Sequence, residues 1–126
     1  MKTLSLIQPW ASLIMDGRKT VETRSWATSY RGPLAIHASM KADKDACKTF
    51  GYCSKTIPRG VILGTSVLVD CVVFPNPRTP PNPYGDYTSG RYGWLLEDIV
   101  RFPTTIPAKG HLSLWEWAGE HQETGP

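Results

Sequence analysis

The residue types best suited to chemistry lie in one short segment near the N-terminus, residues 17–24, with the sequence GRKTVETR. The Arg24 guanidinium offers a planar fork of N–H donors for a phosphate or a carbonyl edge, and the Lys19 ammonium is a mobile point charge. The Glu22 carboxylate can accept a hydrogen bond from an exocyclic amine such as N4 of cytosine, or act as a base. These groups suit either nucleotide recognition or acid–base catalysis.

The same segment predicts that the three charges meet on one side of the chain. Side chains alternate along a strand, so Glu22, Arg24 and Trp26 are expected to share one face. Thr23 is expected on the opposite face, and Lys19, at a corner between a helix and the strand, can reach the side of Glu22. An ion-pair network that fastens the helix to the strand is the structural alternative to a ligand site.

The elements that position this segment are short strands and two helices. Pro9 begins the first helix, because its fixed φ and missing N–H suit the first helical position, and Gly17 ends it as a left-handed cap. The second helix is expected over residues 42–50 and ends at Gly51. Strands are indicated by β-branched, aromatic and alternating residues at 3–7, 20–26, 34–38, 60–74, 92–96, 100–106 and 112–117.

The longest of these strands bears on the architecture. Residues 60–74 are apolar at both odd and even positions, which favours a strand that curves within a closed barrel. We therefore predict an α+β fold, an open or closed β-barrel of about six strands with two flanking helices. The 126 residues, of which 40% are hydrophobic, fit one domain over residues 1–126. This composition excludes a membrane protein, a coiled coil, a disulfide scaffold and a disordered chain.

The charge distribution favours an anionic partner. Residues 1–59 carry ten Lys and Arg against four Asp and Glu, a formal charge of +6, whereas residues 60–126 carry four against seven, −3. A basic half of this kind attracts polyanions such as RNA.

The cysteines and histidines indicate that no metal or other cofactor is bound. Cys47, Cys53 and Cys71 form no CxxC pair, and the histidines lack the spacing of a metal site. An odd number of cysteines, with no signal peptide and no membrane span, predicts a cytoplasmic protein. The oligomeric state stays open.

The segment 75–90 is long and rich in proline, which is typical of a lid, a binding loop or an insertion. It holds Tyr84 and Tyr87, which could stack on a base or fasten the loop to the body of the domain. Trp26, Tyr84 and Tyr92 are the candidate stacking residues. The tryptophans assigned to the core are Trp10, Trp94 and Trp115.

Residues 17–24 resemble the GxKxxExR signature of the ASCH (activating signal cointegrator homology) domain, a relative of the PUA fold. The likeness covers about residues 3–117, with flanking matches at Leu4-Ser5-Leu6, Pro9-Trp10-Ala11, Gly32, Ile36-His37-Ala38-Ser39, Tyr92-Gly93-Trp94, Pro107, Lys109-Gly110 and Leu114-Trp115. The resemblance implies one ASCH-like domain with a PUA-like β-barrel over this core and a tail at 118–126. It also implies that a cleft at the signature binds RNA or a nucleotide through Gly17, Lys19, Glu22 and Arg24.

An enzyme is the alternative that the resemblance carries, because some bacterial ASCH proteins resemble N4-acetylcytidine amidohydrolases and others resemble ribonucleases. In the amidohydrolases a threonine acts as nucleophile beside a lysine. Glu22 holds that position here, and a glutamate is a poor nucleophile toward an amide, although it can activate water. A metal-independent ribonuclease could use Glu22 as base and Lys19 to stabilise the phosphorane, with His37 or His111 as acid. A protein-interaction domain that uses loop 75–90 is a third alternative.

Overall fold

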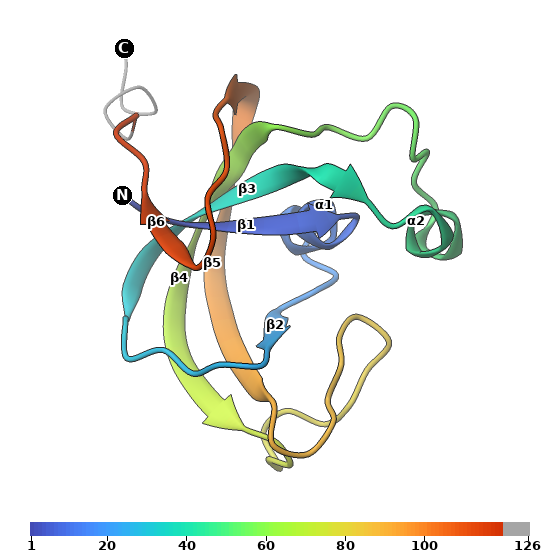
Figure 1. The fold of residues 1–126 in the computed structure, drawn as a ribbon. Helices are drawn as coiled ribbons and strands as arrows, with labels where there is room; N and C mark the ends of the chain where they lie inside the picture. Colours follow the sequence, from blue (N-terminus) through green and yellow to red (C-terminus); the bar gives the residue numbers. More distant parts are fainter. Residues whose placement is uncertain (120–126) are drawn as a thin grey trace.

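The computed structural model describes residues 1–119, and these form six strands and two helices (Figure 1). Residues 120–126, most of the predicted tail at 118–126, lie outside the described residues. The elements are β1 (Lys2–Gln8), α1 (Trp10–Met15), β2 (Val21–Arg24), β3 (Gly32–Ala42), α2 (Lys44–Phe50), β4 (Val61–Val73), β5 (Tyr92–Pro107) and β6 (Leu114–Glu116).

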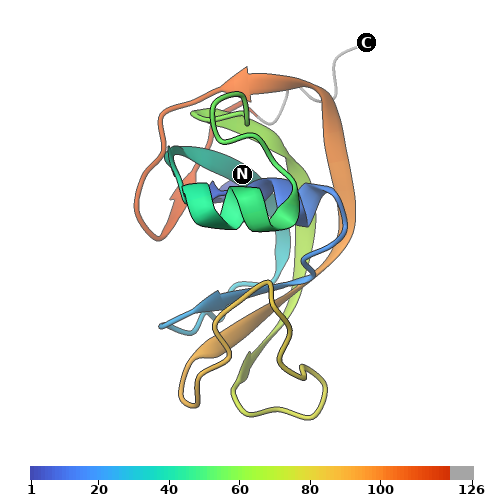
Figure 2. The same ribbon diagram turned by 90° about the vertical axis from the view of Figure 1, so that its right-hand side faces the viewer.

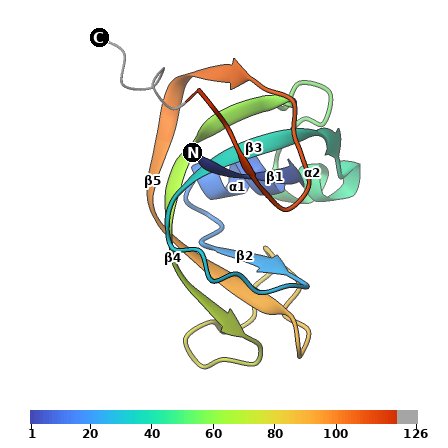
Figure 3. The same cartoon turned by 60° about the vertical axis from the view of Figure 1, so that its left-hand side comes forward.

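The strands form one curled sheet in the order β2-β5-β4-β3-β1-β6. Neighbouring strands are antiparallel, except that β1 and β3 run parallel. Within residues 1–119 the end strands β2 and β6 each pair with one neighbour, so the curl is an open barrel (Figure 3). The α+β class, the six strands and the two helices are confirmed. The closed barrel that the apolar faces of residues 60–74 favoured is wrong, because the curl ends in two free edges.

The long strands β4 and β5 bend the sheet through their whole length (Figure 2). Their pairing shifts register at three places, and one shift lies near Asp98, whose φ is +52°. The sequence predicted two strands, over 92–96 and 100–106, separated by the polar pair Glu97-Asp98. The structure has one strand there instead, because a bulge bends a strand without ending it.

Helix α1 lies on the concave side of the curled sheet and packs against β1, β3, β4 and β5 (Figure 3). Its residues Leu13 and Ile14 are fully buried, and Ile14 belongs to the same apolar cluster as Trp94 of β5. The assignment of Trp94 to the core is therefore confirmed. Pro9 lies at the N-cap position, so the helix starts at Trp10, one residue after the predicted start. Helix α1 thus fills the open barrel, and the chain continues from its end to β2.

A buried histidine fastens β1 and β3 to the segment between β5 and β6. His37 Nε2 lies 2.7 Å from the carbonyl oxygen of Ala108, which can only accept, so Nε2 carries the proton. Nδ1 then accepts from the Ser5 hydroxyl at 2.9 Å, and Trp115 Nε1 donates to that same hydroxyl oxygen at 3.0 Å. Both ring nitrogens therefore have hydrogen-bond partners within the domain.

This network predicts a pH dependence of stability. Burial lowers the pKa of His37 below its ordinary value of about 6.5, so the unfolded chain binds the proton more readily than the folded one. The contribution of neutral His37 to stability is fully present above the ordinary histidine pKa. We therefore expect the free energy of unfolding to fall as the pH decreases from about 7.5 to about 5.5. Urea unfolding at several pH values measures the slope. His37→Gln should flatten the slope, and His111→Gln should retain most of it, because the charge of the exposed His111 lowers the His37 pKa less than burial does. Equal slopes in both variants would refute this account.

Candidate functional site

Three charged side chains of the segment 17–24 meet at the start of β2. Lys19 Nζ lies 3.3 Å from Glu22 Oε1, and Arg24 Nε lies 2.8 Å from Glu22 Oε2. The Lys19 and Glu22 side chains are only 2% and 9% exposed, and that of Arg24 is 24% exposed. The structure therefore brings the three together as a mixed-charge cluster, which we call the KER cluster.

The turn after α1 directs Lys19 into this cluster. Gly17 adopts φ +77°, the left-handed region that glycine enters without strain, and its N–H donates to the carbonyl of Ile14. The N–H groups of Arg18 and Lys19 both donate to the carbonyl of Leu13 at 3.0 Å. Gly17 itself is exposed, so its part in the site is to shape the turn.

Burial sets the electrostatics of Lys19. Desolvation lowers the pKa of its ammonium, and the Glu22 carboxylate acts in the opposite direction. Lys19 Nζ also lies 5.6 Å from the centroid of the Trp10 ring, within cation–π range, and donates a hydrogen bond to the carbonyl of Tyr84. Lys19 is therefore a desolvated cation held by an anion, a ring face and a carbonyl.

The pairing of β2 with β5 supports the other two members of the cluster. Glu22 lies opposite Trp94 and Arg24 lies opposite Tyr92, and directly opposed residues project to the same face of a sheet. Arg24 also reaches across the opening of the barrel, where its Nη2 donates to the carbonyl of Ser5 in β1 at 3.1 Å. The cluster is thus fixed to a buried floor on one side and to β1 on the other.

Two adjoining cavities open beside the KER cluster. The first, about 390 Å³, is called the lysine pocket and is lined by Trp10, Lys19, Glu22, Thr23, Tyr84, Gly85 and Asp86. The second, about 270 Å³, is called the arginine pocket and is lined by Ser5, Leu6, Ile7, Trp10, Glu22, Thr23, Arg24, Ser25, Trp26 and Arg91. They share the walls formed by Trp10, Glu22 and Thr23. Together they reach the size range of small-molecule sites, roughly 300–1,000 Å³.

Loop 75–90 forms one wall of the lysine pocket, rising beside β2 in Figures 1 and 2. The N–H of Asp86 donates to Thr23 Oγ1 at 3.0 Å, and Arg91 Nε donates to the carbonyl of Asp86 at 3.2 Å. The Tyr84 ring packs against Phe50 of α2, with centroids 5.2 Å apart. These contacts hold the loop against β2 and α2.

The candidate stacking residues have different surroundings. Trp26 is half-buried, packs edge-on against Trp94 at 4.8 Å between centroids, and contributes to the arginine pocket. Tyr92 packs half-buried against the core beside Arg24 and lies outside the walls of both pockets. Tyr84 lines the lysine pocket.

Two residues contribute more to the pockets than the sequence indicated. Thr23, which was expected on the face opposite Glu22, lines both pockets. Trp10, which was assigned to the core, packs half-buried against the core and also belongs to the wall that the pockets share.

Sequence reasoning also missed Gly85, Asp86 and Arg91. Loop 75–90 was singled out by its length and prolines, but no pattern indicated which of its residues would meet Lys19. Arg91 follows the loop as an isolated arginine, and only the pairing of β2 with β5 places it beside Thr23.

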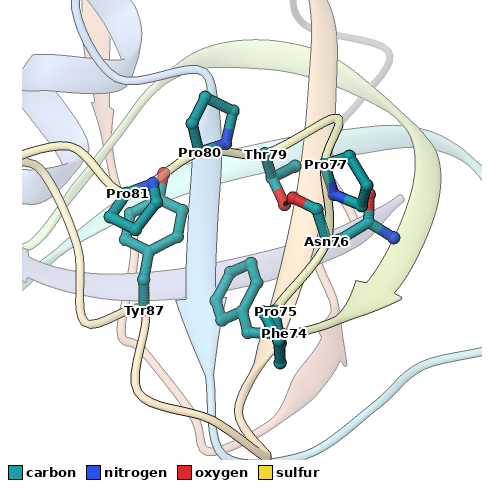
Figure 4. A pocket seen from close by; sticks show the side chains of 8 residues that line it. All are labelled: Phe74, Pro75, Asn76, Pro77, Thr79, Pro80, Pro81 and Tyr87. Atoms are coloured by element: carbon teal, nitrogen blue, oxygen red, sulfur yellow. Dashed lines mark hydrogen bonds between the residues drawn. The ribbon is translucent and has the colours of Figure 1, made fainter.

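A larger cavity, about 470 Å³, lies within the loop itself (Figure 4). It is lined by Phe74, Pro75, Asn76, Pro77, Thr79, Pro80, Pro81 and Tyr87. The rings of Phe74 and Tyr87 lie 4.6 Å apart between centroids, so Tyr87 fastens the loop to the end of β4. None of these lining residues carries a charge at neutral pH, in contrast to the walls of the lysine and arginine pockets.

Within residues 1–119, no three His, Cys, Asp or Glu side chains gather as a metal site would require. Neither helix in that range combines the length and apolarity needed to cross a membrane.

The fit of the loop over Lys19 can be tested with Gly85→Ala. A Cβ atom there would lie 2.6 Å from Thr23 Cγ2, 3.0 Å from Thr23 Oγ1 and 3.4 Å from Lys19 Nζ, so the loop must shift. We expect ligand binding to weaken about 10-fold, equivalent to one lost hydrogen bond, with little change in thermal unfolding. Gly90→Ala is the control in the same loop: its φ of +90° makes alanine strained, but a Cβ meets nothing within 4 Å. Equal ligand affinities in Gly85→Ala and Gly90→Ala would show that the close fit of Gly85 against Thr23 and Lys19 does not affect binding.

Comparisons with known proteins identify the family of this chain. The model of the ASCH domain family matches residues 4–84. Activating signal cointegrator 1 from Homo sapiens is 28% identical over 127 residues, which is 90% of this chain and 22% of the human protein. The Mus musculus protein is 27% identical over 125 residues, with the same coverage. This chain thus spans about a fifth of the length of these relatives.

Among solved structures, ASCH from Zymomonas mobilis superposes with a TM-score of 0.61 and 20% identity, covering 98% of this chain and 92% of that one. A point mutant of the same protein gives a TM-score of 0.60, also at 20% identity, and covers 98% and 94% of the two chains. At this identity the likeness concerns the fold alone, and the family match rests on the sequence. The signature, its flanks and the family model together show that this chain belongs to the ASCH domain family.

Proposed function

We propose that this domain binds single-stranded RNA or a nucleotide in the lysine and arginine pockets. The ASCH domain is a PUA-like fold that is generally thought to bind RNA. The observation that carries the proposal for this chain is the KER cluster, whose buried lysine, carboxylate and guanidinium face two adjoining cavities. The basic half of the chain, residues 1–59, supplies the long-range attraction for a polyanion.

Energetics favour a ligand over a purely structural role for the cluster. Removing charges from water is costly, and a buried ion pair often stabilises a fold no better than apolar side chains of similar volume. Three charged groups beside open cavities are therefore better explained by recognition than by stability. The pockets also have aromatic walls against which a base can stack: Trp10 lines both, Tyr84 lines the lysine pocket and Trp26 lines the arginine pocket.

The test is salt-dependent binding of a labelled single-stranded RNA of about eight nucleotides, followed by fluorescence anisotropy. We expect Arg24→Gln to weaken binding about 10-fold and to reduce the slope of log affinity against log salt by about 1. Arg78→Gln is the matched control, because Arg78 is exposed, pairs with Asp70 at 2.7 Å and lies outside both pockets. Circular dichroism confirms folding. Identical affinities and slopes in the two variants would overturn the proposal.

A hydrolase acting on RNA or on a modified nucleoside is the second candidate, and one observation favours it. Thr23 lines the same pocket as Lys19 and Glu22, so a hydroxyl, an amine-bearing side chain and a carboxylate share one cavity. Turnover of RNA or N4-acetylcytidine that Thr23→Val abolishes would support threonine attack, and turnover that Glu22→Gln abolishes would support water activated by Glu22. Absence of turnover over this panel would leave binding as the function.

A further inference from the structure

The two pockets differ in formal charge, and the difference gives a ligand a direction. The lysine pocket has one cation, Lys19, and two carboxylates, Glu22 and Asp86. The arginine pocket has two guanidiniums, Arg24 and Arg91, and shares the single carboxylate of Glu22. At neutral pH the formal charges of these side chains sum to −1 in the lysine pocket and to +1 in the arginine pocket. A phosphate is therefore repelled from the lysine pocket and attracted to the arginine pocket.

The hydrogen-bonding capacity of Lys19 leads to the same conclusion. An ammonium has three N–H donors. Lys19 already donates to the carbonyl of Tyr84 and contacts Glu22, and the Trp10 ring covers another side. What remains suits one neutral acceptor, such as a ring nitrogen or a carbonyl of a base. The adjacent Glu22 carboxylate can accept from the neighbouring N–H of that base.

The two arginines retain donors for an anion. A guanidinium has five N–H groups. Arg24 contacts the Ser5 carbonyl and Glu22. Arg91 contacts the carbonyls of Asp86 and Thr23 and pairs with the Asp86 carboxylate at 3.5 Å. Their side chains are 24% and 30% exposed, so both groups are anchored and still open to solvent. Anchored guanidiniums suit a phosphate, which prefers forked donors of fixed geometry.

From this charge division we propose that the paired pockets bind one nucleotide unit, with its base in the lysine pocket and its phosphate between Arg24 and Arg91. The inference rests on the proposed function and adds the ligand class: a phosphorylated nucleoside, free or within RNA, rather than an unphosphorylated one. It makes Arg91, which lies outside the ASCH signature, a specificity-determining residue. The shared wall of Trp10, Glu22 and Thr23 places the two subsites next to each other, as a base and its phosphate require.

Calorimetric titration of the full chain tests whether the pockets are divided into a base subsite and a phosphate subsite. The probes are the four ribonucleosides, their 5′- and 3′-monophosphates, inorganic phosphate and a trinucleotide of the base that binds most tightly. We expect the preferred monophosphate to bind about 10-fold more tightly than its nucleoside. Arg91→Gln should remove that gain, so that the monophosphate binds no more tightly than the nucleoside, whereas Arg91→Lys should retain part of it. Arg78→Gln should retain all of it. A trinucleotide that binds more tightly than both monophosphates identifies RNA as the source of the phosphate, and the reverse order identifies a free nucleotide.

The results separate this inference from the proposed function. If the nucleoside and its monophosphates bind equally well to the native protein, or if Arg91→Gln weakens both to the same extent, the division into base and phosphate subsites is wrong while nucleotide binding stands. If neither the nucleosides, the nucleotides nor single-stranded RNA binds in a way that Arg24→Gln weakens, the proposed function fails and the inference fails with it.

Discussion

Replacing Glu22 by glutamine is expected to lower the free energy of unfolding by about 3 kcal/mol and to abolish selective ligand binding. Glu22 is the carboxylate that both Lys19 and Arg24 contact, and removing one partner of a buried ion pair leaves the other charge uncompensated, at a cost of about 3–5 kcal/mol. The lower end applies because Arg24 is partly exposed and screened by water. Glutamine retains the volume, so the loss reports charge rather than packing. Urea unfolding measures it.

The same substitution should change the pKa of Lys19. Glu22 raises the pKa of the Lys19 ammonium, whereas burial and the Arg24 charge lower it, so Glu22→Gln should lower that pKa further.

The matched control for the loss of stability is Glu116→Gln, since Glu116 pairs with Lys2 at 3.0 Å but is 64% exposed. Exposed pairs of this kind contribute about 0–1 kcal/mol. Equal losses of stability in Glu22→Gln and Glu116→Gln would show that the KER cluster is not a tightly coupled buried group.

Trp94→Ala is expected to cost about 3–5 kcal/mol of stability, the largest effect of any single core truncation considered. Trp94 is fully buried, lies opposite Glu22 in the β2–β5 pairing and packs edge-on against Trp26. Its Nε1 donates to the carbonyl of Trp26 at 3.3 Å. Truncation therefore removes both the core contact and the floor beneath the KER cluster, so the melting temperature and the ligand affinity should fall together.

Two further variants calibrate this prediction. Trp94→Phe retains a ring but loses the indole N–H, and should cost less than Trp94→Ala. Trp26→Ala removes a half-buried ring and should also cost less, because the loss scales with the buried surface and the cavity left behind. If Trp94→Ala unfolds at the same temperature as Trp26→Ala, the floor of the site does not depend on Trp94.

Local patterns in the sequence were sufficient for most of the fold. Gly17 and Gly51 end the two helices with φ of +77° and +87°, as left-handed caps do, and strand periodicity located the sheet. These features depend on neighbours in sequence, which a pattern can reveal. The continuous strand β5 was missed, because a polar Glu97-Asp98 pair looks the same in a turn and in a bulge.

The composition of the site was less predictable, for a physical reason. Lys19, Glu22 and Arg24 are close in sequence, and strand alternation was enough to bring the last two to one side. The contacts of Tyr84 with Lys19 and of Arg91 with Thr23 join residues 65 and 68 positions apart. They depend on how loop 75–90 folds back over β2, which local propensities do not encode.

The central claim is that the KER cluster opens into cavities that hold a ligand. Titration of isotopically labelled protein with a short single-stranded RNA, followed through backbone amide resonances, tests it most directly. We predict saturable shifts concentrated at residues 19–24, 84–86 and 91. Saturable shifts confined to other surfaces, or spectra unchanged by the RNA, would contradict it.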